Sequence, residues 1–406
     1  MILFDDGERS YQGPSEHAEG PLAYYNRSAR PEVGRIRDLI EEWLLAYPLP
    51  ERSELVARMR KDHEVCHAAF FELFVYQLLR ATGHEVIPHP ALNGTERRPD
   101  FLATPGPQEQ PCIVECVSVV AETDENHRQQ RLHRRIEDDL NRFRDPNFTF
   151  IIRRLEGSPT QYPRRSALHA FLRSIVAGLD VEEVATKVGR EGAFIESLGR
   201  VYEHMGMTLE VYPWPKSPER RGTTDARSIG AGPITTIRSS AREAIRDGIK
   251  AKAGRYGAVP HQYIVAVNCR TRWGVEDHEP PEALLGSEQV AWTEDRNYRP
   301  IYSGEGAFSH RYKPTNTRVS GALIFSDLAA SSFTRANVRL YHHFGAKVPY
   351  AGPLERLPSA RLIDGSLRNS DGSATVAELL ELWPEWPFDN GDPRGGGWKR
   401  ITLPTS

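Results

Sequence analysis

The chain has 406 residues, of which 39% are hydrophobic and 26% charged, and its formal net charge at pH 7 is −3. This composition is that of a soluble globular protein with enough chain for two or three domains. A net charge so close to zero excludes a general attraction to polyanions, so any contact with nucleic acid must come from local groups of basic residues.

Cysteine usage and the apolar stretches exclude several further classes of protein. The four cysteines form no CxxC pair and show no ligand-like histidine spacing, so neither a zinc site nor a disulfide framework is predicted. The opening residues MILFDDGERS lack the basic region and apolar run of a signal peptide. No apolar stretch approaches the roughly 18 residues of a membrane helix. These absences predict a cytoplasmic protein without a membrane partner.

Residues 1–60 are expected to form an N-terminal arm and helices that pack on the rest of the chain. The chain is polar and interrupted by Gly and Pro up to about Arg30. Pro31 suits the first turn of a helix that runs to about Ala46. Ser53 is expected to cap a further helix. The apolar stripe of the first helix consists of Val33, Ile36, Leu39, Ile40, Trp43 and Leu44.

Residues 61–157 are expected to form the core domain, which begins with a helix that carries an isolated acid. Glu72 has no charged residue three or four positions away, so burial of its carboxylate is costly unless another group compensates it. The alternative is a glutamate at the edge of the apolar stripe that reaches solvent or an arginine elsewhere. The stripe consists of Phe71, Phe74, Val75, Leu78 and Leu79.

Three strands are expected after this helix, at 84–88, 100–104 and 112–120. Clusters of Gly, Pro and polar residues bound each of them. The third, CIVECVSVV, is almost entirely apolar, as a strand covered on both faces should be. Glu115 interrupts it, and an acid in this setting requires a cation, a metal ion or hydrogen-bond donors.

An arginine-rich second helix and a fourth strand at 148–155 follow. Arginine suits phosphate recognition because its planar guanidinium donates two parallel hydrogen bonds. Acids are interleaved with these arginines, so a solvated helix face with ion pairs is an equal alternative. The residues expected to contact nucleic acid are Arg98, Arg131, Arg134 and Arg135.

The order helix, three strands, helix, strand, with Pro99-Asp100 at the second strand and Glu115 in the third, resembles the PD-(D/E)XK, or restriction-endonuclease-like, nuclease superfamily. The resemblance covers roughly a quarter of the chain. It implies an α/β fold with an αβββαβ core, an N-terminal helical arm and a C-terminal α/β extension. It also implies that Asp100, Glu115 and the carbonyl of Cys116 bind Mg²⁺ or Mn²⁺, with Glu72 as the acid of the first helix.

One motif residue departs from the family pattern. The family lysine, two residues after the strand acid, is Val117 here. Side chains alternate across a strand, so Val117 shares a face with Glu115 and brings no cation to it. The metal ion alone could suffice, or the fold could have been kept only for binding. A cation could also come from another residue, with Arg98, Arg131, Lys250 and Lys252 as candidates.

Residues 158–406 are expected to form an α/β region that extends the core or packs on it. Predicted helices lie at 165–177, 181–203 and 237–253, and predicted strands at 208–212, 263–268 and 319–325. The Gly/Pro-rich segment 213–232 is either a substrate-contacting loop or a linker. The segment from Trp383 onward is expected to be a wrapped or mobile tail.

Together with the resemblance, these residues predict a metal-dependent endonuclease that hydrolyses phosphodiester bonds of DNA. Family analogy suggests a role in bacterial antiviral defence, as a homo-oligomer or with a partner protein. One alternative is a catalytically degenerate module on the same fold that binds nucleic acid or protein. Another is a structural α/β protein in which Glu72 and Glu115 form buried ion pairs with arginines.

Overall fold

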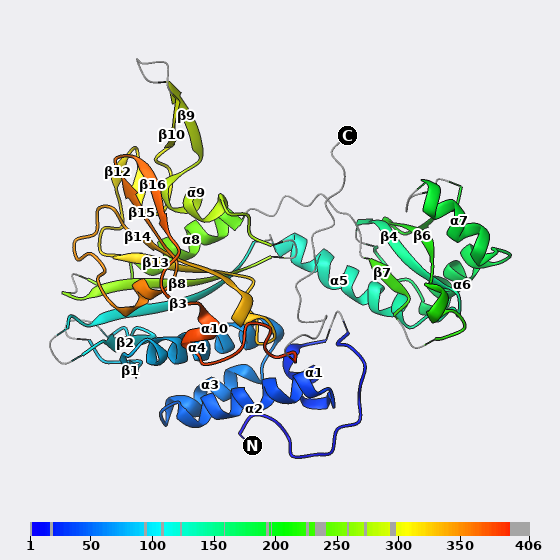
Figure 1. The fold of residues 1–406 in the computed structure, drawn as a ribbon, viewed down its shortest axis with the longest axis horizontal. Coiled ribbons are helices and arrows are strands. Elements are labelled where there is room, and N and C mark those ends of the chain that lie inside the picture. The colour runs from blue at the N-terminus through cyan, green and yellow to red at the C-terminus, as the bar shows by residue number, and fades with distance from the viewer. Residues whose placement is uncertain are drawn as a thin grey trace. The chain divides into compact units, whose positions relative to one another are not determined.

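Two compact units make up the chain (Figure 1). Unit 1 consists of Met1–Pro14, Gly20–Glu122 and Ser239–Ser406, and unit 2 of Ser15–Glu19 and Thr123–Arg238. Most of unit 2 is therefore an insertion within unit 1. The computed structural model describes residues 2–16, 19–92, 96–106, 109–121, 124–157, 159–191, 195, 197–224, 227–231, 241–257, 260–271, 274–292 and 298–389.

Four helices open unit 1, namely α1 (Pro21–Arg27), α2 (Pro31–Ala46), α3 (Glu51–Met59) and α4 (His63–Ala81). Helix α2 begins at Pro31 and ends at Ala46, as predicted. The cap predicted at Ser53 is wrong, because α3 already begins at Glu51. Aromatic rings join these helices, with the Trp43 ring centroid 6.4 Å from that of Phe70.

An eight-stranded mixed sheet forms the centre of unit 1, in the order β1-β2-β3-β8-β13-β14-β15-β16. The first three strands are antiparallel, and β3, β8 and β13 run parallel. The three strands predicted after the first core helix are confirmed. The strand bounds are β1 (Glu85–Pro88), β2 (Phe101–Thr104), β3 (Cys112–Val120), β8 (Gln262–Arg270), β13 (Gly321–Ser326), β14 (Asn337–His342), β15 (Ser359–Ile363) and β16 (Ser366–Ser370).

The two faces of this sheet carry separate apolar cores. Alternation along β3 directs Val114 and Cys116 into the core that contains α4. Ile113 and Val117, which point to the other face of β3, pack in the opposite core with α8 (Ala241–Ala253) and α9 (Glu279–Leu285). Strand β8 is buried along nearly its whole length, as a parallel strand covered on both faces should be.

Helix α8 lies unusually close to β3 because Gly248 has no side chain. A Cβ at Gly248 would lie 2.8 Å from Cγ1 of Val119 and 3.7 Å from both γ carbons of Val117. Val117, which stands at the family's lysine position, is therefore part of a packed helix–strand contact. Lys252 follows Gly248 by four residues, and this spacing places it on the same face of α8, one turn later.

Unit 2 has its own smaller sheet, with the strand order β5-β6-β4-β7. Helices α5 and α6 share its core, in which Ile136 and Leu172 pack with Phe150 and Ile152. The element bounds are α5 (Asp124–Asn141), β4 (Phe148–Gly157), α6 (Arg165–Val176), α7 (Val181–Glu191), β5 (Arg200–His204), β6 (Met207–Pro215), η1 (Pro218–Arg220) and β7 (Ile229–Ala231). The helix predicted at 181–203 is too long, because α7 ends at Glu191 and a strand follows.

The predicted core 61–157 requires a correction. Strand β4 does not join the sheet of β1–β3, because it pairs with β6 and β7 inside unit 2. The next helix and strand along unit 1 are α8 and β8, and β8 pairs with β3. The predicted division into 1–60, 61–157 and 158–406 accordingly differs from the two units. The mixed α/β class is confirmed.

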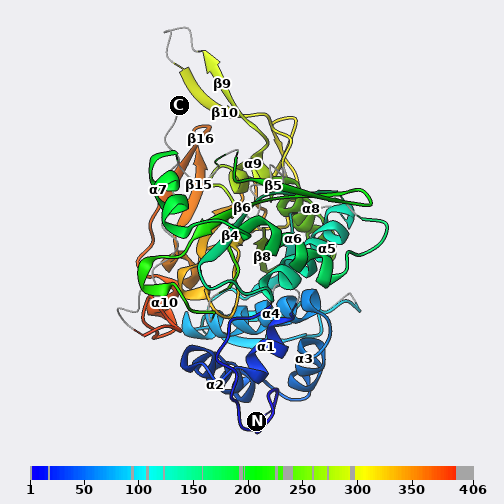
Figure 2. The same ribbon diagram turned by 90° about the vertical axis from the view of Figure 1, so that its right-hand side faces the viewer.

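Smaller elements complete unit 1. The hairpin of β9 (Glu288–Trp292) and β10 (Tyr298–Tyr302) projects from it in Figures 1 and 2. Of the predicted tail, residues 390–406 lie outside the described residues, whereas Trp386 is buried beside Phe333. In the part of the chain that the structure describes, no helix is long and apolar enough to cross a membrane. The remaining short strands and helices of unit 1 are β11 (Ser309–His310), β12 (Lys313–Pro314), η2 (Phe333–Arg335), η3 (Pro353–Arg356) and α10 (Val376–Leu379).

The substitution Gly248→Ala is expected to lower the free energy of unfolding by about 1–3 kcal/mol, because the added methyl group pushes α8 away from β3. Gly34→Ala in α2 is the matched control, since its Cβ would meet only Arg37 Nη2 at 3.6 Å. That control is expected to be neutral or stabilising by up to about 1 kcal/mol. Urea unfolding of both variants measures the difference, and equal effects would contradict the close contact.

Candidate active site

Two acids of unit 1 lie side by side, Asp100 directly before β2 and Glu115 within the neighbouring β3. Phe101 pairs with Val114 in the antiparallel register of β2 and β3. Extending that register by one residue places Asp100 opposite Glu115. Directly opposed residues project from the same face of a sheet, with Cβ atoms about 5 Å apart. The sheet itself therefore brings the two predicted metal-binding side chains together.

Both carboxylates converge on one ammonium group. Lys252, near the end of α8, donates to Oε2 of Glu115, and its Nζ lies 3.5 Å from Oδ2 of Asp100. The hydroxyl of Tyr263 donates to the backbone carbonyl of Lys252 at 2.9 Å and so fixes the end of the helix. Among the cations considered from the sequence whose side chains the structure describes, Lys252 contacts both acids.

Two further donors hold the Glu115 carboxylate, whose side chain is fully buried. Nη1 of Arg255 lies 3.1 Å from Oε2, and the hydroxyl of Tyr256 donates to Oε1. Burial, followed by the hydrogen bond to Glu115, raises the pKa of Tyr256 far above its ordinary value. The phenol therefore stays protonated and acts as a donor.

Asp100 is less completely compensated. Its Oδ2 accepts the backbone N–H of Cys116 at 2.6 Å. Burial above all, and then the charges of Glu115 and Glu72, raise the pKa of Asp100 to about 6, although Lys252 and the Cys116 N–H oppose the shift. The Lys252 charge and the Cys116 N–H therefore offset only part of the cost of removing the Asp100 carboxylate from water.

Glu72, the predicted helix acid, has partners of its own. It is ion-paired with Arg58, lies 3.6 Å from Nε2 of His89 and accepts from the hydroxyl of Tyr47 at 3.4 Å. Burial by itself raises the pKa of Glu72, but His89 and Arg58 outweigh it and hold the value below the ordinary one. Glu72 thus forms a buried ion pair with Arg58, and its negative charge contributes to the raised pKa of Asp100.

The arginines predicted to contact nucleic acid are distributed over both units. Arg98 is exposed in unit 1. Arg134 is half-buried and Arg135 exposed in unit 2, with the Arg135 guanidinium 4.1 Å from the Tyr162 ring centroid. The side chain of Arg131 lies outside what the structure describes.

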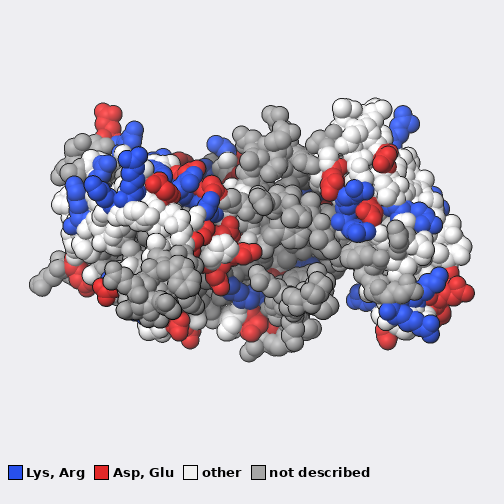
Figure 3. Space-filling view, turned by 90° about the horizontal axis from the view of Figure 1, so that it is seen from above, with Lys and Arg blue, Asp and Glu red and all other residues white. Residues whose placement is uncertain are grey.

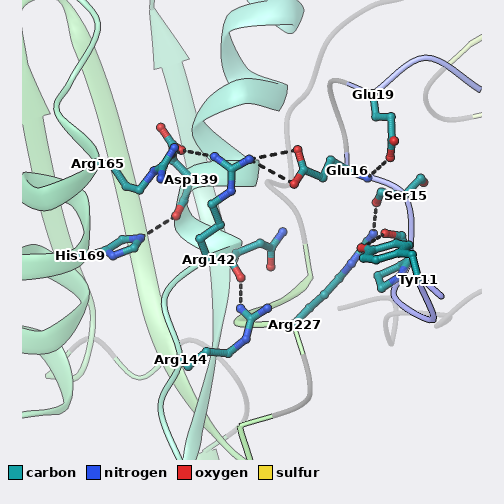
Figure 4. A network of polar contacts seen from close by, with 12 residues as sticks. Tyr11, Ser15, Glu16, Glu19, Asp139, Arg142, Arg144, Arg165, His169 and Arg227 are labelled. Atoms are coloured by element: carbon teal, nitrogen blue, oxygen red, sulfur yellow. Dashed lines mark hydrogen bonds and ion pairs between the residues drawn. The ribbon is translucent and has the colours of Figure 1, made fainter. Parts of the chain in front are cut away.

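The basic surface of unit 2 is in part an ion-pair network. On the face in Figure 3, its Lys and Arg side chains stand beside Asp and Glu. Asp139 of α5 accepts from Arg142 at 3.1 Å and from Arg165 at 2.7 Å, and Arg142 also reaches Glu16 at 3.1 Å (Figure 4). This arrangement matches the alternative of a helix face with interleaved ion pairs for these residues.

Asp100 and Glu115 present two neighbouring carboxylates, both contacted by Nζ of Lys252. Among the described residues, no three His, Cys, Asp or Glu side chains gather closely enough to hold a metal ion. Mg²⁺, however, is commonly bound by one or two carboxylates and completes its shell with water and substrate phosphate. The N–H and C=O groups of a strand residue point toward the same neighbouring strand. Since the Cys116 N–H donates to Asp100, the Cys116 carbonyl also points toward Asp100.

Sequence reasoning missed Arg58, His89, Arg255 and Tyr256. Nothing in their local sequence indicates a buried acid as partner, since each contact joins different parts of the fold. A usable signal existed for Lys252: a glycine one turn earlier in an amphipathic helix permits a close approach to a sheet. Comparisons of the chain with protein-family models, with curated proteins and with solved structures give no match.

Replacing Asp100 by Asn is expected to stabilise the metal-free protein at neutral pH. A carboxyl group whose pKa rises on folding makes the folded state bind protons more strongly, so stability falls as pH rises from about 4 through about 6. Asp100→Asn removes that loss, with an expected gain on the order of 2 kcal/mol at pH 7 and little change at pH 4. Urea unfolding across this pH range measures it. The exposed Asp371→Asn is the control, and parallel curves for all three proteins would contradict the expectation.

The Glu72 cluster is expected to behave as a structural ion pair. Arg58→Met leaves the carboxylate without its arginine and should cost about 3 kcal/mol of unfolding free energy. Adding Glu72→Gln in the same chain should recover at least half of that loss, because a neutral amide needs no cation. Chemical denaturation of the single and double variants checks this. A double variant as unstable as Arg58→Met alone would refute the pairing.

Proposed function

We propose that the protein is a metal-dependent phosphodiesterase of the PD-(D/E)XK type that acts on DNA, with Lys252 in place of the motif lysine. The observation that carries this proposal is the convergence of Asp100 and Glu115 on one ammonium nitrogen. Pro99-Asp100 precedes β2 and Glu115 lies in β3, as in that family's pattern. Without the insertion, α4, β1, β2, β3, α8 and β8 also follow its αβββαβ order.

The substitution of Val117 for the family lysine supports a role for Lys252. Val117 packs against α8 at Gly248, so the position of the motif lysine is taken up by an apolar helix–strand contact. One turn later the same helix face carries Lys252, which meets Glu115. Where the family pattern has a lysine in the strand, this chain has Val117 in β3 and a lysine, Lys252, on α8, which packs over that strand.

Asp100, Glu115 and the Cys116 carbonyl would hold Mg²⁺ or Mn²⁺, which when bound lowers the pKa of a water molecule and offsets phosphoryl charge. Lys252 would keep a proton on Nζ beside both carboxylates, from which it can donate to a phosphate oxygen or orient water. Arg255 and Tyr256 would fix the Glu115 carboxylate through both of its oxygens. They are positioning residues.

One observation favours a catalytically degenerate binding module as the second candidate. Three protein donors already engage the oxygens of Glu115, so the Lys252 ammonium could replace a metal ion permanently. Such a module predicts salt-dependent DNA binding that survives loss of the acids. Cleavage assays separate the two functions.

In a nuclease assay, the purified protein is expected to cleave DNA when Mg²⁺ or Mn²⁺ is present, and cleavage should stop when EDTA removes the metal ion. Asp100→Ala and Glu115→Gln should each lower the cleavage rate by at least about 100-fold. Lys252→Met should lower it by about 100- to 10,000-fold. Lys250→Met is the matched control on the same helix, because Lys250 is exposed, and it should keep full activity.

Two results would contradict the proposal. Equal activity of Lys252→Met and Lys250→Met would remove Lys252 from the mechanism. A wild-type protein that binds DNA but does not cleave it with either metal, and whose binding is unaffected by Asp100→Ala, would establish the degenerate module instead.

A further inference from the structure

The β11–β12 hairpin of unit 1 has an unusual loop. Ser309 pairs with Pro314 and His310 with Lys313, which leaves Arg311 and Tyr312 as a two-residue loop. Both have positive φ, +48° at Arg311 and +63° at Tyr312. Two-residue hairpin loops of this kind favour Asn-Gly, because larger L residues are strained there. Strained backbone of this sort is commonly kept where a side chain has to be displayed.

The loop displays an aromatic ring between two cations. Tyr312 is 68% exposed, the largest exposed fraction among the exposed large hydrophobic side chains of the described residues. Arg311 and Lys313 on either side are exposed as well. Such a tip offers a flat apolar surface flanked by positive charge.

The base that carries this tip is firmly held. A Cβ at Gly304 would lie 2.5 Å from the backbone nitrogen of Tyr312, so the loop packs directly on that glycine. The amide of Thr315 donates to the Phe308 carbonyl at 2.9 Å, and the buried Phe308 ring lies 4.3 Å from the ring of His343. The hairpin tip with Tyr312 is therefore held in place before any ligand binds.

The surrounding sequence is strongly basic although the whole chain is slightly acidic. Residues 306–354 contain one acid, Asp327, and six Lys or Arg residues, whereas the formal net charge of the chain is −3. Glu305, just before the segment, contacts His310 at the base of the hairpin. Figure 3 shows Lys and Arg side chains gathered at the end of unit 1 where Figure 1 places β12 and β16. The six Lys and Arg residues of segment 306–354 are Arg311, Lys313, Arg318, Arg335, Arg339 and Lys347.

This segment is connected to the candidate active site. Arg318, six residues after Tyr312, donates to the backbone carbonyl of Tyr256 and lies 3.4 Å from that of Gly257. The Tyr256 hydroxyl in turn donates to Glu115. The basic segment therefore touches a residue that positions one of the two acids.

We propose that the β11–β12 hairpin binds DNA, with the Tyr312 ring stacked on an unpaired base and Arg311 and Lys313 on the flanking phosphates. Aromatic stacking combined with basic side chains is how proteins hold single strands without reading their sequence. This inference rests on the proposed function for its choice of ligand. It adds the substrate form, a DNA segment with unpaired bases.

The test replaces the loop with its most favourable sequence. Arg311→Asn combined with Tyr312→Gly supplies the residues that two-residue hairpins prefer, so the melting temperature should be unchanged or higher. Affinity for a fluorescein-labelled single-stranded oligothymidylate, measured by anisotropy in EDTA to prevent cleavage, should fall about tenfold or more. Tyr312→Phe keeps the ring and is the matched control, with affinity expected to stay close to wild type.

Each outcome bears on the hairpin separately from catalysis. Equal affinity of the wild type and the Asn-Gly variant, or no binding by the wild type, overturns the inference whatever the cleavage assay gives. A lower melting temperature of the Asn-Gly variant overturns the argument from backbone strain. If the wild type binds through the hairpin but does not cleave, the proposed hydrolase is wrong and the DNA contact stands.

Discussion

The candidate site depends on one interaction, in which the buried Glu115 carboxylate and the half-buried Asp100 carboxylate share the Lys252 ammonium group. Burial of Asp100, together with the charge of Glu115, opposes ionisation of Asp100, and Lys252 offsets this only in part, so the pKa of Asp100 is raised to about 6. Carboxyl groups whose pKa is raised in this way are found often at functional sites, and also in structural ion-pair networks.

The rest of unit 1 brings these three groups together. The β2–β3 register sets Asp100 opposite Glu115, and Gly248 lets α8 approach β3 closely enough for Lys252 to reach the pair. Lys252 and Glu115 are 137 residues apart in the chain because unit 2 is inserted between them. Close packing and ion pairing therefore act at the same contact, and a change that lifts α8 from β3 affects both.

Local sequence predicted the acids but not their partners. The apolar context of Glu115 correctly indicated a buried carboxylate in a strand, because that pattern is local. The sequence also contains two helix–strand segments that could follow β3, α5–β4 and α8–β8, and amphipathic patterns do not encode which one pairs with it. For Glu72 the sequence leaves two alternatives, a buried acid that needs compensation or an acid at the stripe edge that reaches solvent or an arginine, and it does not identify Arg58 and His89 as the partners.

A titration with Mn²⁺, followed by the loss of its free paramagnetic resonance signal, tests most directly whether the ammonium stands in a divalent-cation site. The wild type should bind one Mn²⁺ per chain, and Asp100→Asn or Glu115→Gln should abolish that binding. Lys252→Met should bind Mn²⁺ at least as tightly as the wild type, because a competing positive charge has been removed. Binding that is absent from all four proteins, or that survives loss of either acid, would contradict a metal site at this pair.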